Sequence, residues 1–196
     1  AKVLQNRSVE MAKKLNVNLV SRSSFTPEVE GTLITKEENI MEKPIVSGIA
    51  LDKNQIRVGM YGVTDKPGIA ASIFTSLADE NINVDMIVQT VGVDGKTDLD
   101  FTIPTTDLLI CKNVMEKFKT QAENIDYNEA ICKVSIVGVG MKSHTGVASK
   151  AFTALANENI NIRIISTSEI KISMIIDEKY AELAVRALHE AYDLDK

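Results

Sequence analysis

The chain has 196 residues, of which 44% are hydrophobic and 25% charged, and its formal net charge is −5. This length suits one domain or two small ones. The acidic balance without a Lys/Arg cluster argues against nucleic acid as a partner, because phosphate neutralisation needs a basic face. No apolar run approaches the roughly 18 residues of a membrane span, and no apolar signal core opens the chain. We therefore expect a cytoplasmic protein without a membrane partner, in which Cys111 and Cys132 are buried thiols.

The first part of the chain is expected to differ from the rest. Residues 8–15 have apolar positions at helical spacing, and residues 17–20 alternate like a short strand. A loop with Pro27 and Gly31 follows, and residues 37–43 are charged, as in a linker. So short a piece cannot bury a core alone, and it is predicted to be the end of something larger.

The middle of the chain predicts strands and helices in a regular succession. The predicted elements are strands at 45–50 and 56–63, a helix from 69 to 81–83, strands at 84–93 and 97–103, and a helix at 107–123. The dipeptide Asp94-Gly95 between the last two strands is a strong hairpin signal.

The last third of the chain repeats this order. The predicted elements are a strand at 133–139, a loop at 140–146, a helix at 147–157, strands at 160–166 and 171–176, and a helix at 180–192. One further strand in each copy completes a ferredoxin-like βαββαβ unit, and residues 45–50 and 125–131 are the candidates. The early strand could serve the second copy, in which case the first copy is an insertion within it. The predicted fold class is α+β, with antiparallel sheets that carry helices on one face.

The two copies also share sequence. Aligned without a gap, residues 62–87 and 140–165 are identical at 12 of 26 positions, 78 residues apart. A period of that length exceeds the roughly 20–50 residues of a solenoid repeat. The repeat therefore predicts two copies of one small domain, with ligand sites between copies.

The loops before the first helix of each copy have the most chemical character. Gly68 and Gly146 let a ligand approach the backbone, and a helix amino terminus attracts carboxylates, although an ordinary tight turn explains such a loop as well. Asn81 and Asn83 suit either turn chemistry or amide contacts with an amino acid. His144 has no acid, cysteine or second histidine at catalytic or metal-ligand spacing, and no nucleophile, nucleotide-loop or paired-carboxylate motif is present.

Several motifs resemble one known family in order along the chain. They are Gly62-Val-Thr-Asp-Lys-Pro-Gly68, Asn81-Ile-Asn-Val-Asp-Met86, Gly138-Val-Gly-Met-Lys-Ser-His144 and Ile165-Ser-Thr-Ser-Glu-Ile170. Together they resemble the tandem ACT domains of bacterial aspartokinase, and residues 1–7 and 20–25 resemble the end of its kinase domain. The resemblance implies a kinase-domain remnant plus linker at 1–40, a first ACT domain at 56–127, and a second ACT domain formed by 43–55 with 128–196.

The resemblance also implies a function. Aspartokinase phosphorylates L-aspartate with ATP, the first step towards lysine, threonine and methionine, and is feedback-inhibited by end products. The amino-terminal part of the kinase domain is absent here, so the chain alone is expected to be an inactive carboxy-terminal fragment with no catalytic residue, metal or cofactor of its own. ATP and Mg belong to the full enzyme, and Lys2 matches a position that approaches ATP in the family.

Lysine and threonine bind between ACT domains of two chains in that family, which implies a homodimer, with the kinase domain or a catalytic α subunit as a further partner. The contacts carried over from the first copy are Asp65, Pro67, Gly68, Ile69, Ala70, Asn83, Val84, Asp85 and Gln89. Those from the second copy are Ala148, Asn159, Asn161, Ile162, Ser168 and Glu169. Because Asp65-Lys-Pro becomes Ser143-His-Thr in the second copy, and Asp85 becomes Arg163, we expect the two loops to differ in ligand preference.

Two other functions remain open from the sequence. A stand-alone ACT-type sensor could regulate another enzyme or a transcription factor, although the first 25 residues argue against it. A small enzyme on the ferredoxin-like fold, such as an acylphosphatase, would need an anion-holding arginine in the first loop, and neither loop contains one.

Overall fold

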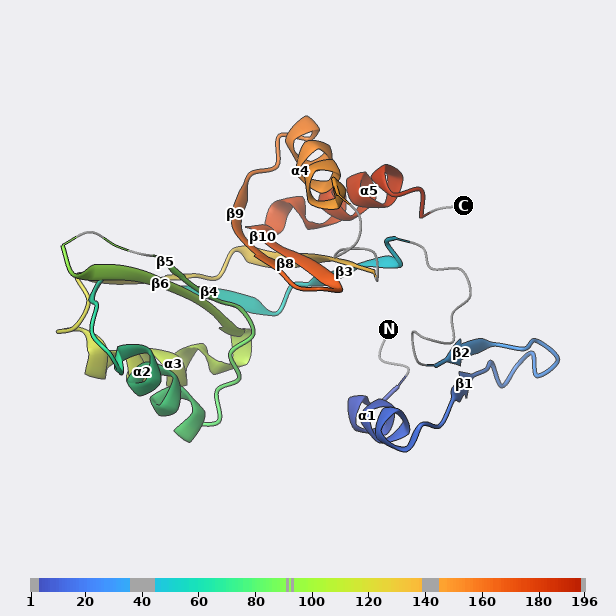
Figure 1. Cartoon of the computed structure of the whole chain (residues 1–196), viewed down its shortest axis with the longest axis horizontal. Helices are drawn as coiled ribbons and strands as arrows, with labels where there is room; N and C mark the ends of the chain where they lie inside the picture. The colour runs from blue at the N-terminus through green and yellow to red at the C-terminus, as the bar shows by residue number, and fades with distance from the viewer. Residues whose placement is uncertain (1–3, 36–44, 91, 93, 139–144, 195–196) are drawn as a thin grey trace. The chain divides into compact units, whose positions relative to one another are not determined.

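The computed structural model describes residues 4–35, 45–90, 92, 94–138 and 145–194 (Figure 1). The chain divides into two compact units, residues 1–44 and residues 45–196. The linker predicted at 37–43 and the loop residues Ser143 and His144 lie outside the described residues, as does Lys2.

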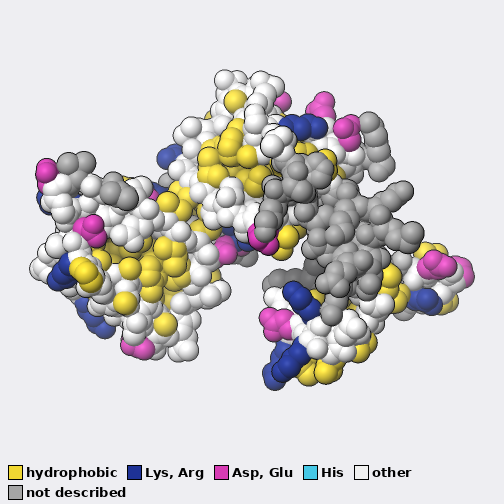
Figure 2. Space-filling view, in the orientation of Figure 1, with side chains coloured by type: hydrophobic (Ala, Val, Ile, Leu, Met, Phe, Trp, Pro, Cys, Tyr) yellow, Lys and Arg dark blue, Asp and Glu magenta, His cyan; other side chains and the backbone are white. Residues whose placement is uncertain are grey.

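The first unit consists of helix α1 (Asn6–Leu15) and an antiparallel pair of short strands, β1 (Leu19–Ser21) and β2 (Thr32–Ile34). The helix ends at Asn16, whose φ of 57° is left-handed, a conformation that asparagine tolerates better than most residues. No described residue of this unit is buried, and hydrophobic side chains reach its surface (Figure 2). Leu15 and Phe25 are among the exposed hydrophobic residues. This agrees with the prediction that the leading part has no core of its own.

The second unit contains two four-stranded antiparallel sheets. The first sheet has the strand order β5-β6-β4-β7, with α2 and α3 on one face (Figure 1). Its elements in chain order are β4 (Gln55–Thr64), α2 (Ile69–Asp79), β5 (Ile87–Thr90), β6 (Lys96–Pro104), α3 (Leu108–Met115) and β7 (Asn124–Asn128). Alternate residues of β4, among them Val58 and Met60, are buried in one cluster with Ile73 and Leu77 of α2, which we call the first core.

The second sheet has the order β3-β8-β10-β9, and α4 and α5 cover one face (Figure 1). Its elements are β3 (Gly48–Asp52), β8 (Ile131–Val137), α4 (Val147–Asn157), β9 (Ile162–Thr167), β10 (Lys171–Asp177) and α5 (Ala181–Ala191). Strand β3 comes before the whole first sheet in the chain but pairs with β8, with Asp52 opposite Lys133. Residues such as Val134, Leu155 and Leu188 form the second core. The predicted α+β architecture of two ferredoxin-like units with antiparallel sheets is confirmed.

Several predicted elements differ in their bounds from those observed, and three of them are described here. The helix predicted at 107–123 ends at Met115, and a 3₁₀ turn (Glu116–Phe118) follows and brings Phe118 into the first core. The strand predicted at 125–131 is interrupted, because the N–H of Ala130 donates to the Asn128 side chain in a turn between β7 and β8. The strand predicted at 84–93 begins only at Ile87.

The two sheets contact each other through side chains on their helix-free faces. Met86, Ile131, Ile164 and Ile175 are buried together in a cluster that belongs to neither helix-covered core, and Val88 packs against it. We call these residues the inter-sheet cluster. It fixes the segment before β5 of the first sheet against β8, β9 and β10 of the second.

Candidate functional site

The loop between β4 and α2 exposes backbone at a helix start. Asp65, Pro67 and Gly68 are exposed, and the Asp65 N–H donates to the Gly95 carbonyl at 2.8 Å. Gly68 has a φ of 94°, and a Cβ built there would meet no atom within 4 Å. No side chain caps α2. The Ile69 N–H donates to the Lys66 carbonyl at 3.2 Å, so the N–H of Ala70, the next residue of the first turn, is the one left open to an acceptor from outside.

The other predicted residues of the first copy lie on the segment that leads into β5. Asn83 is exposed, whereas Val84 packs against the first core. The Asp85 N–H donates to the Thr102 carbonyl at 3.1 Å, which extends the pairing of this segment with β6. Gln89 is exposed on β5, an edge strand of the first sheet.

The second copy repeats this arrangement at α4. Gly146 has a φ of 90° with open space around it, and no side chain caps the helix. Ala148 and Ile162 pack against the second core, and Asn161 is exposed. Asn159 is left-handed, with a φ of 55°.

Ser168 and Glu169 lie in the turn between β9 and β10. The Ser168 N–H and hydroxyl both donate to the Lys171 carbonyl, at 2.8 and 3.3 Å. The hydroxyl predicted as a ligand contact therefore has a local role in closing this hairpin.

Each copy attaches its helix start and its strand start to one core. Ile69, Ile82 and Val84 contribute to the first core. Val147 and Ile160 make the same contribution to the second core, together with Ile162. The helix start and the strand start of each copy therefore rest on the same core, the first core in the first copy and the second core in the second.

The sequence prediction missed the residue that neutralises Asp85. The Lys133 ammonium of β8 is ion-paired with the Asp85 carboxylate and lies 3.7 Å from Asp52 Oδ2. Gln55 Nε2 donates to the same Asp52 oxygen at 2.9 Å. No local sequence pattern signals the pair with Asp85, because the two residues are 48 positions apart in the chain.

A second charged cluster lies on β4, β6 and β7. Arg57 Nη2 lies 2.5 Å from Asp100 Oδ1, and Arg57 Nη1 lies 3.4 Å from Asp126 Oδ2. Burial raises the pKa of Asp100 above its ordinary value, and the nearby carboxylates of Asp126 and Asp98 add to the effect while Arg57 opposes it. None of these residues was predicted, and their contacts with one another indicate a structural role.

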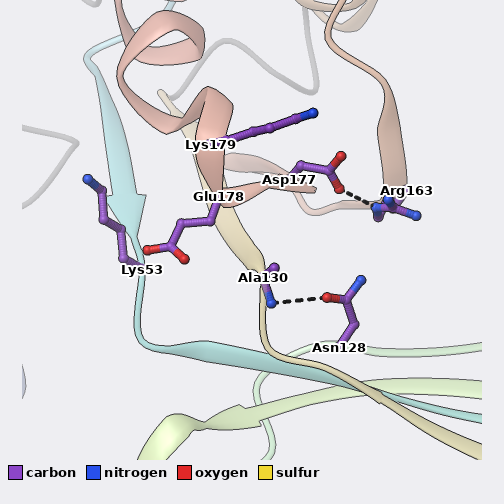
Figure 3. A pocket seen from close by; sticks show the side chains of 7 residues that line it. All are labelled: Lys53, Asn128, Ala130, Arg163, Asp177, Glu178 and Lys179. Atoms are coloured by element: carbon purple, nitrogen blue, oxygen red, sulfur yellow. Dashed lines mark hydrogen bonds and ion pairs between the residues drawn. The ribbon is translucent and has the colours of Figure 1, made fainter.

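A cavity of about 590 Å³ lies where the chain passes between the two sheets (Figure 3). It is lined by Lys53, Asn128, Ala130, Arg163, Asp177, Glu178 and Lys179. Arg163 Nε donates to Asp177 Oδ1 at 2.6 Å, and Lys53 pairs with Glu182 at 2.7 Å. None of the predicted effector contacts lines this cavity, and two of its three cations are already paired, so we assign it no ligand.

Catalytic groups were not expected, and the thiols have no reactive environment. Cys111 and Cys132 are free and buried, as predicted, and burial raises the pKa of each thiol to about 11. Within the described ranges, no group of three His, Cys, Asp or Glu could hold a metal ion. Over the same part of the chain, every helix is too short or too polar to cross a membrane.

The fold and the paired helix starts define a tandem ACT-domain protein, and the family model described as ACT domain matches residues 56–117 and 134–192. Aspartokinase from Helicobacter pylori is 66% identical over an alignment of 200 positions, which covers all of this chain and 49% of that protein. Aspartokinase from Pseudomonas aeruginosa is 53% identical over 202 residues and is covered to 48%. The chain therefore belongs to the aspartokinase family, as its ACT-domain regulatory region, and it spans about half the length of these curated relatives.

Solved structures give the same answer for the regulatory part. A crystal structure of aspartokinase alpha and beta subunits has a TM-score of 0.70 at 51% identity and covers 76% of this chain and 99% of that one. The ligand-free regulatory subunit of aspartate kinase from Thermus thermophilus has a TM-score of 0.71 at 40% identity, with 75% and 98% covered. Escherichia coli aspartokinase III with lysine and aspartate (T-state) has a TM-score of 0.76 at 25% identity, with 96% and 42% covered.

Proposed function

We propose that this chain senses amino-acid end products for an aspartokinase. In this proposal, lysine, threonine or both bind between ACT domains and regulate the ATP-dependent phosphorylation of L-aspartate by an attached kinase domain. The observation that carries the proposal is the uncapped start of α2 beside Gly68, which has open space around it and recurs at Gly146.

The chemistry of these loops suits an α-amino acid. The N–H groups that follow Gly68 can hold an α-carboxylate at the positive end of the helix dipole. Exposed amide side chains at Asn83 and Asn161 supply both donors and acceptors, and the acids Asp85 and Glu169 supply negative charge for an ammonium.

Edge strands support the proposed homodimer. β5 and β9 each lie at one edge of a sheet, and both expose an isoleucine, Ile87 at 51% and Ile165 at 43%. An unpaired edge with exposed apolar side chains favours pairing with another chain. A second copy would bring two sets of loops together, as binding between ACT domains requires.

The division of the chain follows from the same proposal. Residues 1–40 would be the end of a kinase domain plus linker, residues 56–127 the first ACT domain, and residues 43–55 with 128–196 the second. Pairing of β3 with β8 supports the split second domain. ATP, Mg and catalysis would then belong to the rest of the enzyme or to a catalytic α subunit, with Lys2 near the nucleotide, and this chain alone would be inactive.

An effector regulates only through different affinities for two arrangements of the enzyme, typically a coupling of about 1–3 kcal/mol. Structures of Escherichia coli aspartokinase III are described both with aspartate and ADP as an R-state and with lysine and aspartate as a T-state. An equivalent pair of states in the full protein is part of this proposal.

Calorimetric titration of the chain with L-lysine and L-threonine tests the proposal. We expect saturable heat with at least one of them, and about fivefold weaker binding in Asn83→Ala, because one hydrogen bond contributes roughly 1 kcal/mol. Asn113→Ala, an exposed asparagine on α3, is the matched control and should bind as the unaltered chain does. Absence of heat with either amino acid at millimolar concentration would overturn the proposal.

A further inference from the structure

The carboxylate of Asp85 already has a cationic partner within the chain. Under the proposed function, Asp85 is the acid of the first copy that is available to the side-chain ammonium of an effector such as lysine. In the structure, its carboxylate is ion-paired with Lys133, whose side chain is only 13% exposed, whereas that of Asp85 is 31% exposed. A second ammonium at this carboxylate would have to displace Lys133 or be repelled by it.

Lys133 is held in place from the second sheet. It lies on β8 between Ile131 of the inter-sheet cluster and Val134 of the second core, and Asp52 stands directly opposite in the pairing with β3. Asp52 Oδ2 lies 3.7 Å from the Lys133 ammonium, so two carboxylates share this cation. Rigid strands on both sides therefore fix the ammonium in front of Asp85.

The cluster contains a further acceptor. Gln55 is 6% exposed, and its Nε2 donates to Asp52, whereas its buried Oε1 has no hydrogen-bond partner within the described residues. The carboxylates of Asp52 and Asp85 both face the Lys133 ammonium, and the Gln55 side-chain N–H binds the Asp52 carboxylate. Such a group stabilises a cation at the position of Lys133.

In the second copy, the position equivalent to Asp85 also takes part in an ion pair, but with different residues. Arg163 takes the place of Asp85 in the repeat, and it pairs with Asp177 at 2.6 Å. Neither copy therefore offers an unpaired carboxylate at this position to the side-chain ammonium of a ligand.

We propose that Lys133 determines the effector specificity of the first copy by occupying the cation position at Asp85. This inference rests on the proposed function and deepens it. An effector with an uncharged side chain, such as threonine, leaves the Lys133–Asp85 pair intact. Lysine must compete with Lys133, so its side-chain ammonium gains little at Asp85. Lys133 is thus a specificity-determining residue contributed by the second sheet to the site of the first.

The test compares lysine and threonine binding by calorimetry in matched variants of the chain. Lys133→Met removes the cation and keeps most of the side-chain volume, and Lys133→Gln keeps a hydrogen-bond donor for Asp52 and Asp85. We expect both to tighten lysine binding by about tenfold, in the range of close charge pairs at binding sites, and to change threonine binding by less than about twofold. Lys119→Met, which breaks an exposed pair with Glu116, is the control and should change neither.

A complementary variant tests the same inference without altering Lys133. Because Asp85 is already neutralised, Asp85→Asn should affect lysine and threonine equally. A selective loss of lysine binding of about tenfold in this variant would show that the carboxylate is available to the ligand, as for a direct ion pair, and would overturn the inference. Asp85 is partly exposed, so this variant is expected to fold.

The outcomes separate the inference from the proposed function. If the unaltered chain binds either amino acid but both Lys133 variants leave the lysine affinity unchanged or lower, the inference is wrong and the proposed function stands. An equal gain for both amino acids also contradicts it, because the side-chain charge would then not matter. If neither the unaltered chain nor any variant binds lysine or threonine, the proposed function is overturned, and the inference falls with it.

Discussion

At the scale of single residues, Gly59 allows a charged cluster to form on the first sheet. A Cβ at this position would lie 2.8 Å from Arg57 Nη2 and 2.9 Å from the Tyr61 hydroxyl. Without a side chain at Gly59, Arg57 donates to the Tyr61 hydroxyl and also reaches the carboxylates of Asp100 and Asp126. The glycine is thus explained by the side chains above it, whereas Gly68 is explained by its own backbone angle.

Replacing Arg57 by methionine should destabilise the chain by about 3 kcal/mol at neutral pH, because the removal of one partner leaves the other charge buried. Asp100 is the carboxylate at stake, with a side chain that is 19% exposed. Urea unfolding measures the loss, and Lys119→Met is the control, since its pair with Glu116 is exposed and should contribute less than about 1 kcal/mol.

The loss should shrink in acid. Burial already raises the pKa of Asp100, and without Arg57 it rises further, while the unfolded chain keeps the ordinary value of about 3.9. Below that value the carboxyl is protonated in both states, so its burial no longer costs a charge. A loss of stability that is equally large at acidic and neutral pH would contradict this account.

At the scale of elements, both copies end their first helix in the same way. The Ile82 N–H donates to the Leu77 carbonyl at 3.0 Å, and the Asn81 N–H donates to Ala78 at 2.9 Å, which is a Schellman motif. Asn81 has a left-handed φ of 59°, and Asn159 closes α4 in the same conformation. The Asn-Ile pair that both copies share at this point is therefore explained by its role in ending the helix, whatever further contacts Asn159 makes.

Asn81→Val should lower the free energy of unfolding by about 1–2 kcal/mol, because a β-branched residue is strained in the left-handed region. Asn81→Gly should remain within a few tenths of a kcal/mol of the original, since glycine adopts this conformation readily. Thermal unfolding followed by circular dichroism measures both changes. Asn83→Val is the matched control, because Asn83 is exposed and lacks a positive φ, and an equal loss there would remove the capping explanation.

The spacing of apolar residues predicted the bounds of an element well where a single helical or strand pattern covered the whole element. The helix at 147–157 has the predicted bounds, since its apolar positions recur at helical spacing and Gly146 marks its start. The break between β7 and β8 was missed because Asn128 and Ala130 form a turn without glycine or proline. The ion pair of Asp85 with Lys133 could not be predicted, because its partners are 48 residues apart on two sheets whose mutual packing follows from no local pattern.

At the scale of the second unit, the inter-sheet cluster joins two small cores. Each copy alone is near the lower size at which a single core is stable. Ile131 and Ile175 of the second sheet are fully buried against Met86, which precedes β5 of the first sheet. We therefore expect the two copies to unfold together, in one cooperative transition.

The two thiols report on this coupling, since Cys111 lies in the first core and Cys132 in the second. Both are fully buried with a pKa of about 11, so alkylation requires opening of the surrounding core. Pulse alkylation across a urea series, read for each cysteine by mass spectrometry, should give one shared midpoint. Two midpoints in the unaltered chain would contradict the coupling.

Ile131→Ala should separate those midpoints. The truncation removes contacts of the inter-sheet cluster at a cost of about 2–4 kcal/mol while both helix-covered cores keep their side chains. Ile170→Ala, at a residue that is 53% exposed, is the matched control and should leave one midpoint. When the cluster that joins two units is weakened, the less stable unit should open first, at a lower urea concentration. If Ile131→Ala instead lowers both midpoints equally, other contacts hold the two copies together.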